Sequence, residues 1–546
     1  MDSETFLQTS YTLIRTLAAV PPGSQARTLP TASALTTARS SLPNPSRPPS
    51  PPVSSSSSTT STTSSNSPTV IPLGPQATIQ HLLTAIAPAL PGHNRSGRYF
   101  GFVTGSTLPV AEAADNLASA FDTSPQVHLP EQSIATEVED VALRLLLQLL
   151  NLGLNPSNGE GNGESDVGLD WEGRTFTTGA TASNILGLAC GREEVVRRRL
   201  SHGSEGTVGE VGILGACAEA GVREIRVLTS MGHSSLSKAA SVVGLGRGAV
   251  KELPYSEAEP WRLNLDVVER ELKRTEEGVA SIVAISAGEV NTGRFATTGL
   301  EEMRRLRALA DKYKAWIHVD GAFGIFARAL PDTEEFAKLR ESVAGLELAD
   351  SITVDGHKLL NVPYDTGIFF TRRSSTLHAI FQNPNAVYLT PSGSGPAIPS
   401  PLNIGIENSR RFRALPVYAV LVSEGPSGIA EMLVRMVRLA RGIAHALVSP
   451  DEKPNLSDDY ELLPDSSAAE STHVIVMFRA RDERLNSVLV KKIQESGEWY
   501  VSGTKWKGQP ACRIAVSSWR VKVEEDLEFV KSKLADIAKE WKESGR

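Results

Sequence analysis

The chain has 546 residues, a formal net charge of −7 at pH 7, 40% hydrophobic residues and 21% charged residues. That length allows a large domain with a deep core and a smaller second domain, while the acidic balance argues against a general nucleic-acid-binding protein. The three cysteines, Cys190, Cys217 and Cys512, are scattered without CxxC spacing, so we expect neither a disulfide framework nor a metal site.

The start of the chain shows no targeting signal. Its first residues, MDSETFLQTS, lack the basic start and apolar core of a signal peptide, and they lack the Arg-rich, acid-poor composition of a mitochondrial presequence. Apolar runs of bilayer-spanning length are not evident either. We therefore expect a cytoplasmic protein in a reducing compartment, without nucleic-acid or membrane partners.

Residues 1–75 are predicted to be a largely disordered N-terminal segment. Phe6–Val20 favours a short amphipathic helix, which Pro21 and Pro22 would end. From Ser41 to Pro68 nearly every residue is Ser, Thr or Pro. Such a segment cannot bury enough apolar surface to offset the entropy that it loses on ordering.

Residues 76–165 are predicted to form a helical segment that packs on the large domain. Within it, Thr136–Asn151 favours a buried helix that begins with a capping box of Thr136 and Glu139. The stretch Asn155–Gly168 is rich in Gly, Asn and Glu, which predicts an exposed loop. The apolar positions of the helix at helical spacing are Val138, Val141, Ala142, Leu145 and Leu149.

Residues 166–405 alternate short apolar segments with helical stretches such as Leu300–Tyr313. This alternation predicts an α/β large domain, whose mostly parallel sheet is flanked by helices and carries its site at the carboxyl ends of the strands. The expected strands are Glu224–Leu228, Ser281–Ile285, Ala315–Val319, Ser351–Val354 and Gly367–Thr371. Residues 406–546 change in pattern and predict a smaller C-terminal α+β domain. Its expected elements are helix Phe412–Ser423, strand His473–Arg479, helix Ser487–Glu495, strand Cys512–Ser517 and helix Val523–Lys542.

Two strand ends deliver ionisable side chains. The segment ITVDGHK ends in Lys358, and a lysine used for Schiff-base chemistry must be fixed near a carbonyl and able to lose its proton. The segment WIHVDGAFG contains Asp320 followed by the small Ala322. Such a carboxylate can keep the pyridine nitrogen of pyridoxal 5′-phosphate (PLP) protonated, and a small residue lets the ring lie flat. The alternatives are a solvated surface lysine and an aspartate that caps a helix.

Two further segments fit the same chemistry. The stretch Thr177–Asn184 places hydroxyls and backbone N–H groups at a helix start, which can bind the cofactor phosphate. Ordinary helix capping explains the same residues. His233 follows the strand Glu224–Leu228 and can stack on the cofactor ring, or it can be a solvated loop residue.

In this order, these segments resemble the group II PLP-dependent amino-acid decarboxylases. The resemblance runs from about Tyr99 to the C-terminus. It implies the PLP-dependent transferase type I (aspartate aminotransferase-like) fold, PLP as cofactor, an L-amino acid as substrate, and a homodimer with its sites at the interface. Further segments similar to the family are Arg98–Gly105 (RYFGFVTG), Thr136–Glu139 (TEVE), Asn361–Asp365 (NVPYD), Ser409–Leu415 (SRRFRAL) and Arg513–Arg520 (RIAVSSWR).

The resemblance also implies the catalytic residues and the residues around the cofactor ring. Lys358 would form the Schiff base with PLP and later move protons. Asp320 would pair with the pyridine nitrogen, and Ala322 would lie against the ring. His233 would stack on the ring and take part in the substrate chemistry.

The remaining implied contacts are to the phosphate and the substrate. Ala180 and Thr181, with neighbouring backbone N–H groups, would hold the phosphate, and His357 would complete that side. Phe102 and Tyr388 are the candidate substrate residues.

Two segments depart from the family. Ser286–Asn291 (SAGEVN) lies where relatives have a Gly-Thr-Thr-like turn, so Glu289 is not expected to supply a hydroxyl contact. Thr390–Ser409 contains no tyrosine, whereas many members carry one on a mobile loop here, and relatives that lost it tend toward oxidative deamination. Its Gly, Pro and Ser content nevertheless suits a mobile lid.

Three functions follow from these observations. Decarboxylation of an L-amino acid through Lys358 is the first expectation. The second is a PLP enzyme of another reaction type: an aldehyde synthase, an aminotransferase or a carbon–carbon lyase. The third is a non-catalytic PLP-fold scaffold, against which the intact set of Lys358, Asp320 and His233 argues.

Overall fold

The computed structural model describes residues 2–21, 26–43, 73–153, 171–201, 206–383 and 398–545. The chain divides into two compact units. One unit combines Met1–Tyr99 with Ile493–Tyr500, and the other combines Phe100–Lys492 with Val501–Arg546. The four domain ranges expected from the sequence remain predictions.

The first unit is mainly helical. Helix α1 (Ser3–Ala18) confirms the helix predicted near the N-terminus, and Asp2 caps it by accepting a hydrogen bond from Thr5 N. Helices α2 (Ala32–Ser41) and α3 (Gly74–His81) follow, and α3 continues into a π-turn and a 3₁₀ turn. Most of the predicted Ser/Pro-rich disordered segment lies outside the described residues, as does the predicted loop Asn155–Gly168.

The second unit is built on a seven-stranded sheet of order β2-β8-β7-β6-β5-β3-β4. Strands β7, β6, β5, β3 and β4 run parallel, whereas β8 is antiparallel to both of its neighbours. The mostly parallel α/β sheet is therefore confirmed, together with all five predicted strands. The bounds are β2 (Gly173–Thr177), β3 (Glu224–Thr229), β4 (Val250–Glu252), β5 (Val279–Ser286), β6 (Trp316–Asp320), β7 (Ser351–Asp355) and β8 (Gly367–Thr371).

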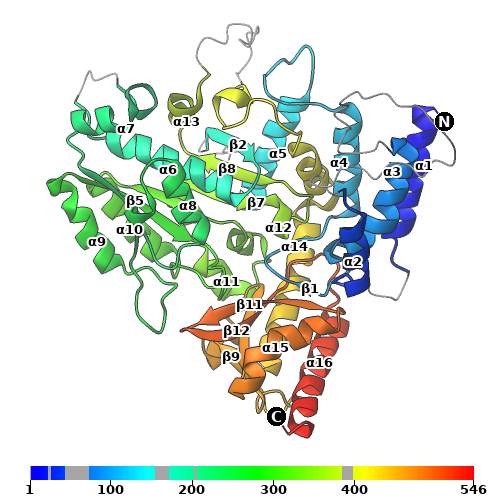
Figure 1. The fold of residues 1–546 in the computed structure, drawn as a ribbon. Helices are drawn as coiled ribbons and strands as arrows, with labels where there is room; N and C mark the ends of the chain where they lie inside the picture. Colours follow the sequence, from blue (N-terminus) through cyan, green and yellow to red (C-terminus); the bar gives the residue numbers. More distant parts are fainter. Residues whose placement is uncertain are drawn as a thin grey trace, which may run out of the picture. The chain divides into compact units, whose positions relative to one another are not determined.

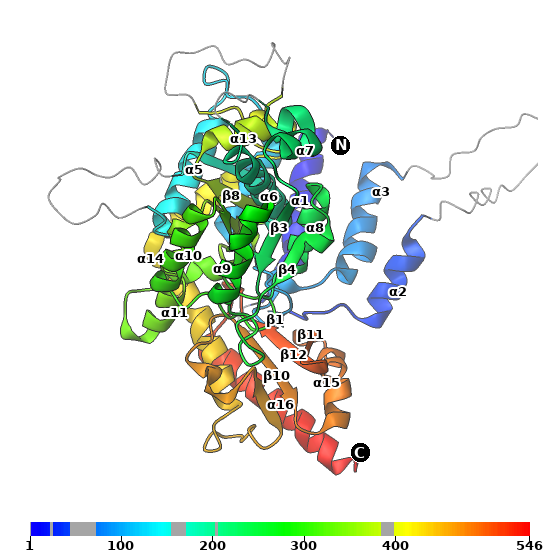
Figure 2. The same cartoon turned by 90° about the vertical axis from the view of Figure 1, so that its left-hand side faces the viewer.

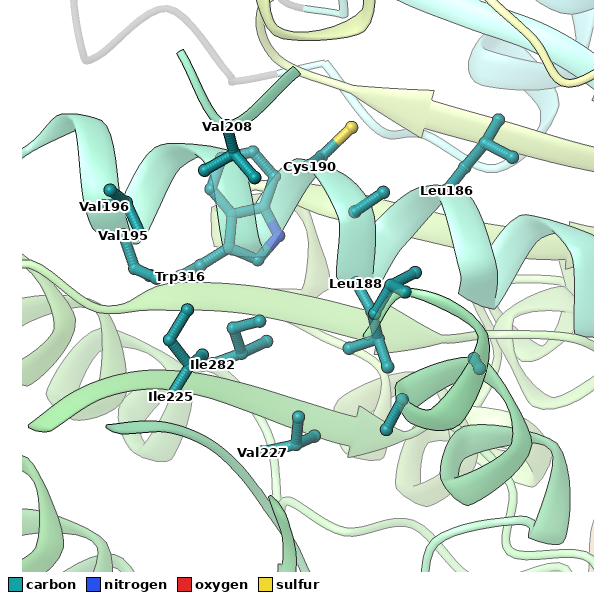
Figure 3. Close-up of a cluster of buried hydrophobic side chains, with 14 of the residues drawn as sticks. Leu186, Leu188, Cys190, Val195, Val196, Val208, Ile225, Val227, Ile282 and Trp316 are labelled. Carbon is teal, nitrogen blue, oxygen red and sulfur yellow. The ribbon is translucent and has the colours of Figure 1, made fainter. Parts of the chain in front are cut away.

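Helices cover both faces of this sheet (Figures 1 and 2). On one face, α6 packs on β5, β6, β7 and β8 and on α8, and on the other α9 and α10 pack together. Figure 3 shows side chains of α6, such as Leu188, facing Ile282 of β5 and Val227 of β3 in the buried cluster. The helix bounds are α6 (Ala180–Arg197), α7 (Val208–Glu219), α8 (Ser234–Val242), α9 (Leu265–Lys273), α10 (Leu300–Lys312), α11 (Ala337–Ser342), α12 (Gly356–Leu359) and α13 (Ser374–Phe381).

Helix α5 (Ala135–Leu149) confirms a predicted helix but corrects two of its details. Its N-cap is Ile134, which makes no side-chain cap, so the predicted capping box is wrong. Thr136 instead bonds the ring of His128, and Glu139 pairs with Arg410. The predicted buried stripe is also shifted, because Val141 is 43% exposed. The buried apolar positions are Ala135, Ala142, Leu143, Leu146 and Leu147.

The C-terminal part has the predicted α+β pattern, with antiparallel pairing of β11 with β12, β12 with β10, and β10 with β9. The predicted helix from Phe412 to Ser423 is the first segment of a longer helix, α14, which continues across a kink at Gly425 (φ 59°). The bounds here are α4 (Pro109–Phe121), α14 (Ala414–Ala446), β9 (Tyr460–Leu463), β10 (Ile475–Ala480), α15 (Glu483–Glu495), β11 (Tyr500–Trp506), β12 (Gln509–Ala515) and α16 (Val523–Glu543); the short β1 is Tyr99–Phe100.

Among the described residues, α14 is the one helix long and apolar enough, by length and composition, to cross a membrane. The sequence analysis did not anticipate it, because the kink separates two shorter apolar stretches. Helix α14 packs against α4, α5 and α16 inside this unit, and 33% of its apolar window is buried there.

Candidate active site

A cavity of about 650 Å³ lies in the second unit, next to the carboxyl ends of the parallel strands. This volume is typical of a site for a small molecule or cofactor. Tyr388, which was predicted together with Phe102 to contact the substrate, lies outside the described residues. The predicted site residues that line the cavity are Phe102, Ala180, Thr181, His233, Asp320, Ala322, His357 and Lys358.

Lys358 lies in α12, the short helix that begins directly after β7. Its Nζ is 2.9 Å from Asp355 Oδ2 and 5.8 Å from the ring centroid of Phe323. The Asp355 side chain is only 3% exposed. A buried carboxylate therefore holds the amine at the cavity wall, which excludes the alternative of a solvated surface lysine.

Asp320 is the last residue of β6, and its two carboxylate oxygens have different partners. Oδ2 accepts a hydrogen bond from Asn184 Nδ2 at 2.8 Å, and Oδ1 accepts one from Ala322 N at 3.3 Å. The 3₁₀ turn that follows has Phe323 as its N-cap, so Asp320 does not cap it. The carboxylate lies in the cavity wall, ready to pair with a cationic ring nitrogen.

The phosphate-binding segment predicted from the sequence forms the start of α6. Its N-cap, Gly179, brings no side-chain cap to this helix, while Thr178, Ala180 and Thr181 line the cavity. The N–H groups of the first turn and the helix dipole together favour an anion here. The hydroxyl of Thr177 is committed elsewhere, 2.7 Å from Ser183 Oγ.

The two predicted histidines are both oriented by neighbours. His233 is the N-cap of α8, and its Nδ1 accepts a hydrogen bond from Ser235 N at 3.1 Å, so the neutral ring carries its hydrogen on Nε2. His357 donates from Nδ1 to Thr366 O at 2.8 Å. Burial lowers the pKa of His357, with the charge of Asp355 opposing this shift.

Arg513 of β12 also lines the cavity, a position that sequence analysis left without a role. Its Nε donates to Val290 O and its Nη1 to Phe102 O, each at 2.5 Å. Its Nη2 is buried and has no hydrogen-bond partner in the described part of the chain. Burial lowers the pKa of Arg513 to about 10, and Glu289 opposes that shift. A charged residue inside the apolar strand segment CRIAV was the available signal.

Tyr364 lies in the cavity wall, and Glu289 lies between two residues of that wall, Gly288 and Val290. Tyr364 lines the cavity with its ring centroid 4.7 Å from that of His357. Glu289, expected to make no hydroxyl contact of the family kind, instead closes its own turn. It accepts hydrogen bonds from Asn291 N at 2.9 Å and from Thr292 N at 2.8 Å.

The residues present fit PLP. The amine of Lys358 matches the aldehyde of PLP, and the carboxylate of Asp320 matches its pyridine nitrogen. The start of α6, which has no side-chain cap, matches the phosphate, and the small Ala322 matches the flat ring. Oδ1 of Asp355 is also buried without a hydrogen-bond partner among the described residues, beside the amine and close to Gly179. Such an atom indicates a polar group that belongs in this cavity.

Comparisons with known proteins agree with this fit. The family described as "Pyridoxal-dependent decarboxylase conserved domain" matches residues 86–467. The chain is 30% identical over 328 residues to histidine decarboxylase of Drosophila melanogaster, covering 60% of this chain and 34% of that protein. It is 26% identical over 254 residues to 3,4-dihydroxyphenylacetaldehyde synthase of Drosophila melanogaster, covering 45% of this chain and 46% of the synthase.

A solved structure shows the same fold. The crystal structure of Oryza sativa TDC with PLP and tryptamine superposes with a TM-score of 0.72 at 20% identity, covering 99% of this chain and 98% of that one. This likeness confirms the predicted fold class. The family match spans most of the chain, and the chain therefore belongs to the family of PLP-dependent decarboxylases.

Proposed function

We propose that this chain decarboxylates an L-amino acid with PLP held by Lys358. The observation that carries the proposal is the single cavity lined by Lys358, Asp320, His233 and the start of α6. These groups come from four different strand ends, and each supplies one of the contacts that PLP requires. The chain covers only 34% of the length of the histidine decarboxylase. The proposed activity therefore rests on the site described above and not on that relative.

Each lining residue has a distinct part in holding the cofactor. Lys358 would bind it covalently through Nζ, the N–H groups of Ala180 and Thr181 would hold its phosphate, and Asp320 Oδ1 would meet its ring nitrogen. When bound, PLP supplies an electron sink for the electron pair left on the substrate α-carbon. Ala322 leaves room for the flat ring because its side chain is a single methyl group.

Lys358 also lies where it could transfer protons to and from the substrate. Its Nζ lies 2.9 Å from Asp355 Oδ2, and this carboxylate would hold the amine at the cavity whenever the amine is not bound to the cofactor. His233 presents a hydrogen on Nε2, because its Nδ1 is occupied as an acceptor. The chain therefore places two groups that can hold or release a proton in the wall of the same cavity.

We assign Arg513 to the substrate carboxylate. Its buried Nη2 has uncommitted N–H donors, and a guanidinium is the side chain best suited to a carboxylate. Among the described residues that line the cavity, Lys358 and Arg513 are the basic side chains besides the two histidines. Because Lys358 would hold the cofactor, Arg513 remains to pair with one carboxylate, that of the substrate backbone. We therefore favour a substrate whose side chain is not acidic.

The direct test incubates the purified, PLP-loaded protein with a panel of amino acids and measures CO₂, peroxide and keto acid together. Decarboxylation predicts CO₂ and an amine, with neither peroxide nor keto acid. A substrate converted only to keto acid would show an aminotransferase instead.

A second candidate function is aldehyde synthesis. It is favoured by the absence of tyrosine between Thr390 and Ser409. In that reaction, the amino acid, O₂ and water would give CO₂, an aldehyde, ammonia and hydrogen peroxide. Equal amounts of CO₂ and peroxide in the same panel would select this candidate over the amine-forming reaction.

We also propose that the protein is a cytoplasmic homodimer without nucleic-acid or membrane partners. The acidic net charge of −7 supports the first absence. Apolar side chains exposed on the neighbouring helices α4 and α14 support a protein interface, namely Leu117 (49%), Phe121 (75%) and Val422 (59%). Light scattering of the purified protein would test the dimer, and a monomer at micromolar concentration would refute it. Cell fractionation would test the location.

A further inference from the structure

A chain of buried hydrogen bonds extends from Asp320 into the layer between α6 and the sheet. Asn184 Nδ2 donates to Asp320 Oδ2 at 2.8 Å, and Asn184 Oδ1 lies 2.9 Å from His318 Nε2. His318 Nδ1 lies 2.8 Å from Ser351 Oγ. Asn184, His318 and Ser351 are each 0% exposed, so water does not compete for these contacts.

The chemistry of the partners sets the direction of every bond. A carboxylate can only accept, so the Asn184 amide must turn its Nδ2 toward Asp320 and its Oδ1 toward His318. His318 Nε2 therefore carries the ring hydrogen. Burial lowers the pKa of His318 to about 4, with Asp320 opposing, so the ring is neutral and its Nδ1 accepts from the Ser351 hydroxyl. Trp316 Nε1 donates to the same Ser351 Oγ at 3.0 Å.

The Asn184 amide also serves a second cavity residue. Its Nδ2 lies 3.2 Å from Ser235 Oγ, and that hydroxyl lies 2.7 Å from His233 Nδ1. Because Ser235 Oγ accepts from the amide, its own hydrogen is available for His233. One buried amide thus orients both the carboxylate of Asp320 and the ring of His233.

The local sequence explains why these groups meet. Side chains alternate along a strand, so Trp316, His318 and Asp320 of β6 project to the same face, where α6 lies. Gly187 of α6 makes room for the histidine, since a Cβ there would lie 2.2 Å from His318 Cε1. A glycine inside a helix is destabilising relative to alanine, so its presence here is explained by the space that the His318 ring requires.

We propose that His318 and Asn184 are positioning residues that hold Asp320 and His233 in one orientation for the cofactor. The proposal rests on the proposed function for the assignment of Asp320 to the cofactor ring. His318 acts through Asn184 and does not line the cavity. Loss of its Nε2–H leaves Asn184 Oδ1 without a donor and frees the amide to rotate away from Asp320.

The test titrates apo-protein with PLP and follows the visible absorbance of the bound cofactor. His318→Phe preserves a buried ring but removes both hydrogen bonds, and we expect it to raise the Kd for PLP about tenfold or more. His473→Phe is the matched control, because His473 is also buried (1% exposed) but lies outside the cavity lining and the hydrogen-bonded chain. It should leave the Kd within about twofold of wild type.

A second readout separates positioning from folding. Weakening the Asn184 donor changes the electrostatic environment of the carboxylate that faces the cofactor, so the pH at which the absorbance of the bound cofactor changes should shift in His318→Phe. Ser351→Ala is the milder variant and should change the Kd and this pH in the same direction by a smaller amount. His318→Gln, which retains an N–H donor, should restore part of the affinity.

The outcomes are distinct. If wild type fails to bind PLP, the proposed function falls and this inference falls with it. If wild type binds and the folded His318→Phe protein shows the same Kd and pH profile, His318 is only structural and the inference is overturned. If His318→Phe does not fold, Ser351→Ala decides in the same way.

Discussion

The amine of Lys358 and a carboxylate oxygen of Asp355 lie 2.9 Å apart in the cavity wall. Strand β7 ends at Asp355 and α12 begins at the next residue, so the sheet itself sets the position of the amine. The other oxygen of Asp355, Oδ1, is buried and without a hydrogen-bond partner within the described ranges. This pairing fixes the position of the Lys358 amine, as covalent attachment of a cofactor requires.

Replacing Lys358 with alanine tests that attachment. We expect Lys358→Ala to abolish the visible absorbance of the PLP-loaded protein and to lower CO₂ release at least about a thousandfold, because the nucleophilic amine is gone. Lys338→Ala is the control, since Lys338 is an exposed lysine of α11. An absorbance band that survives in Lys358→Ala would show that another residue holds the cofactor.

Arg513 provides a prediction about substrate binding. Arg513→Lys keeps a positive charge but cannot reproduce the planar group that bonds Val290 O and Phe102 O while presenting Nη2. We expect the KM for the amino acid to rise on the order of 10- to 100-fold, with a smaller change in the Kd for PLP. Arg484→Gln, at an arginine side chain that is 71% exposed, should change neither. A rise in the Kd for PLP alone would instead assign Arg513 to the cofactor.

Arg410 and Arg411 are neighbours in the sequence with different structural roles. Arg410 pairs with Glu139, both side chains being at most 6% exposed, and it also donates to Pro125 O. Arg411 pairs with Asp115 at the surface. Because removal of one partner strands a buried charge, Arg410→Ala should lower the free energy of unfolding by about 3–5 kcal/mol, and Arg411→Ala by less than about 1 kcal/mol. Denaturant unfolding of both variants measures the difference, and equal losses would contradict it.

Most of the fold and most of the candidate site residues could be predicted from the sequence, because the patterns that indicate them are local. Each predicted strand of the large sheet appeared, since an apolar run bounded by polar turns depends on its own residues. Lys358, Asp320 and His233 could be recognised because each lies at the end of a strand or within four residues after it. The reversed direction of β8 was not visible, because strand pairing is set by the partners and not by the run itself.

Long-range partners explain what the sequence did not reveal. Thr136 and Glu139 have the spacing of a capping box, yet a histidine and an arginine from elsewhere in the chain claim their side chains. Asn184 looked like one of several polar residues at a helix start. Its two partners, Asp320 and His318, come from a strand more than one hundred residues away in the sequence. Such contacts require the folded chain.

Two buried histidines predict how stability depends on pH. Burial lowers the pKa of His318 to about 4 and that of His473 to about 3, both below the usual 6.5. Between pH 6.5 and these lowered pKa values, the two histidines bind protons in the unfolded chain but not in the folded one. Their contribution to stability is therefore complete above pH 6.5 and is lost as the pH is lowered toward 4. Thermal unfolding of the apo-protein should show this loss, about 3 kcal/mol for each histidine.

The control for that effect is His473→Phe, which removes one of the two groups. Its stability should fall less steeply between pH 6.5 and 4 than that of wild type, because a phenyl ring binds no proton. A variant with the same slope as wild type would show that carboxylates elsewhere dominate the acid response.

Tyr364 lines the cavity, and Thr390–Ser409 contains no tyrosine, so this hydroxyl is a candidate proton donor to the α-carbon. Partial desolvation at the cavity wall raises the pKa of Tyr364, of which 54% is exposed, and a hydrogen bond to Thr104 opposes the shift, so the hydroxyl keeps its proton at neutral pH. We expect Tyr364→Phe to lower amine formation about 10- to 100-fold and to raise the share of aldehyde and peroxide. Tyr255→Phe is the control, because Tyr255 has a similar exposed fraction (49%) but lies outside the cavity lining. If Tyr364→Phe retains the wild-type rate and product ratio, the proton comes from another group, and Lys358 and His233 become the donors to test next.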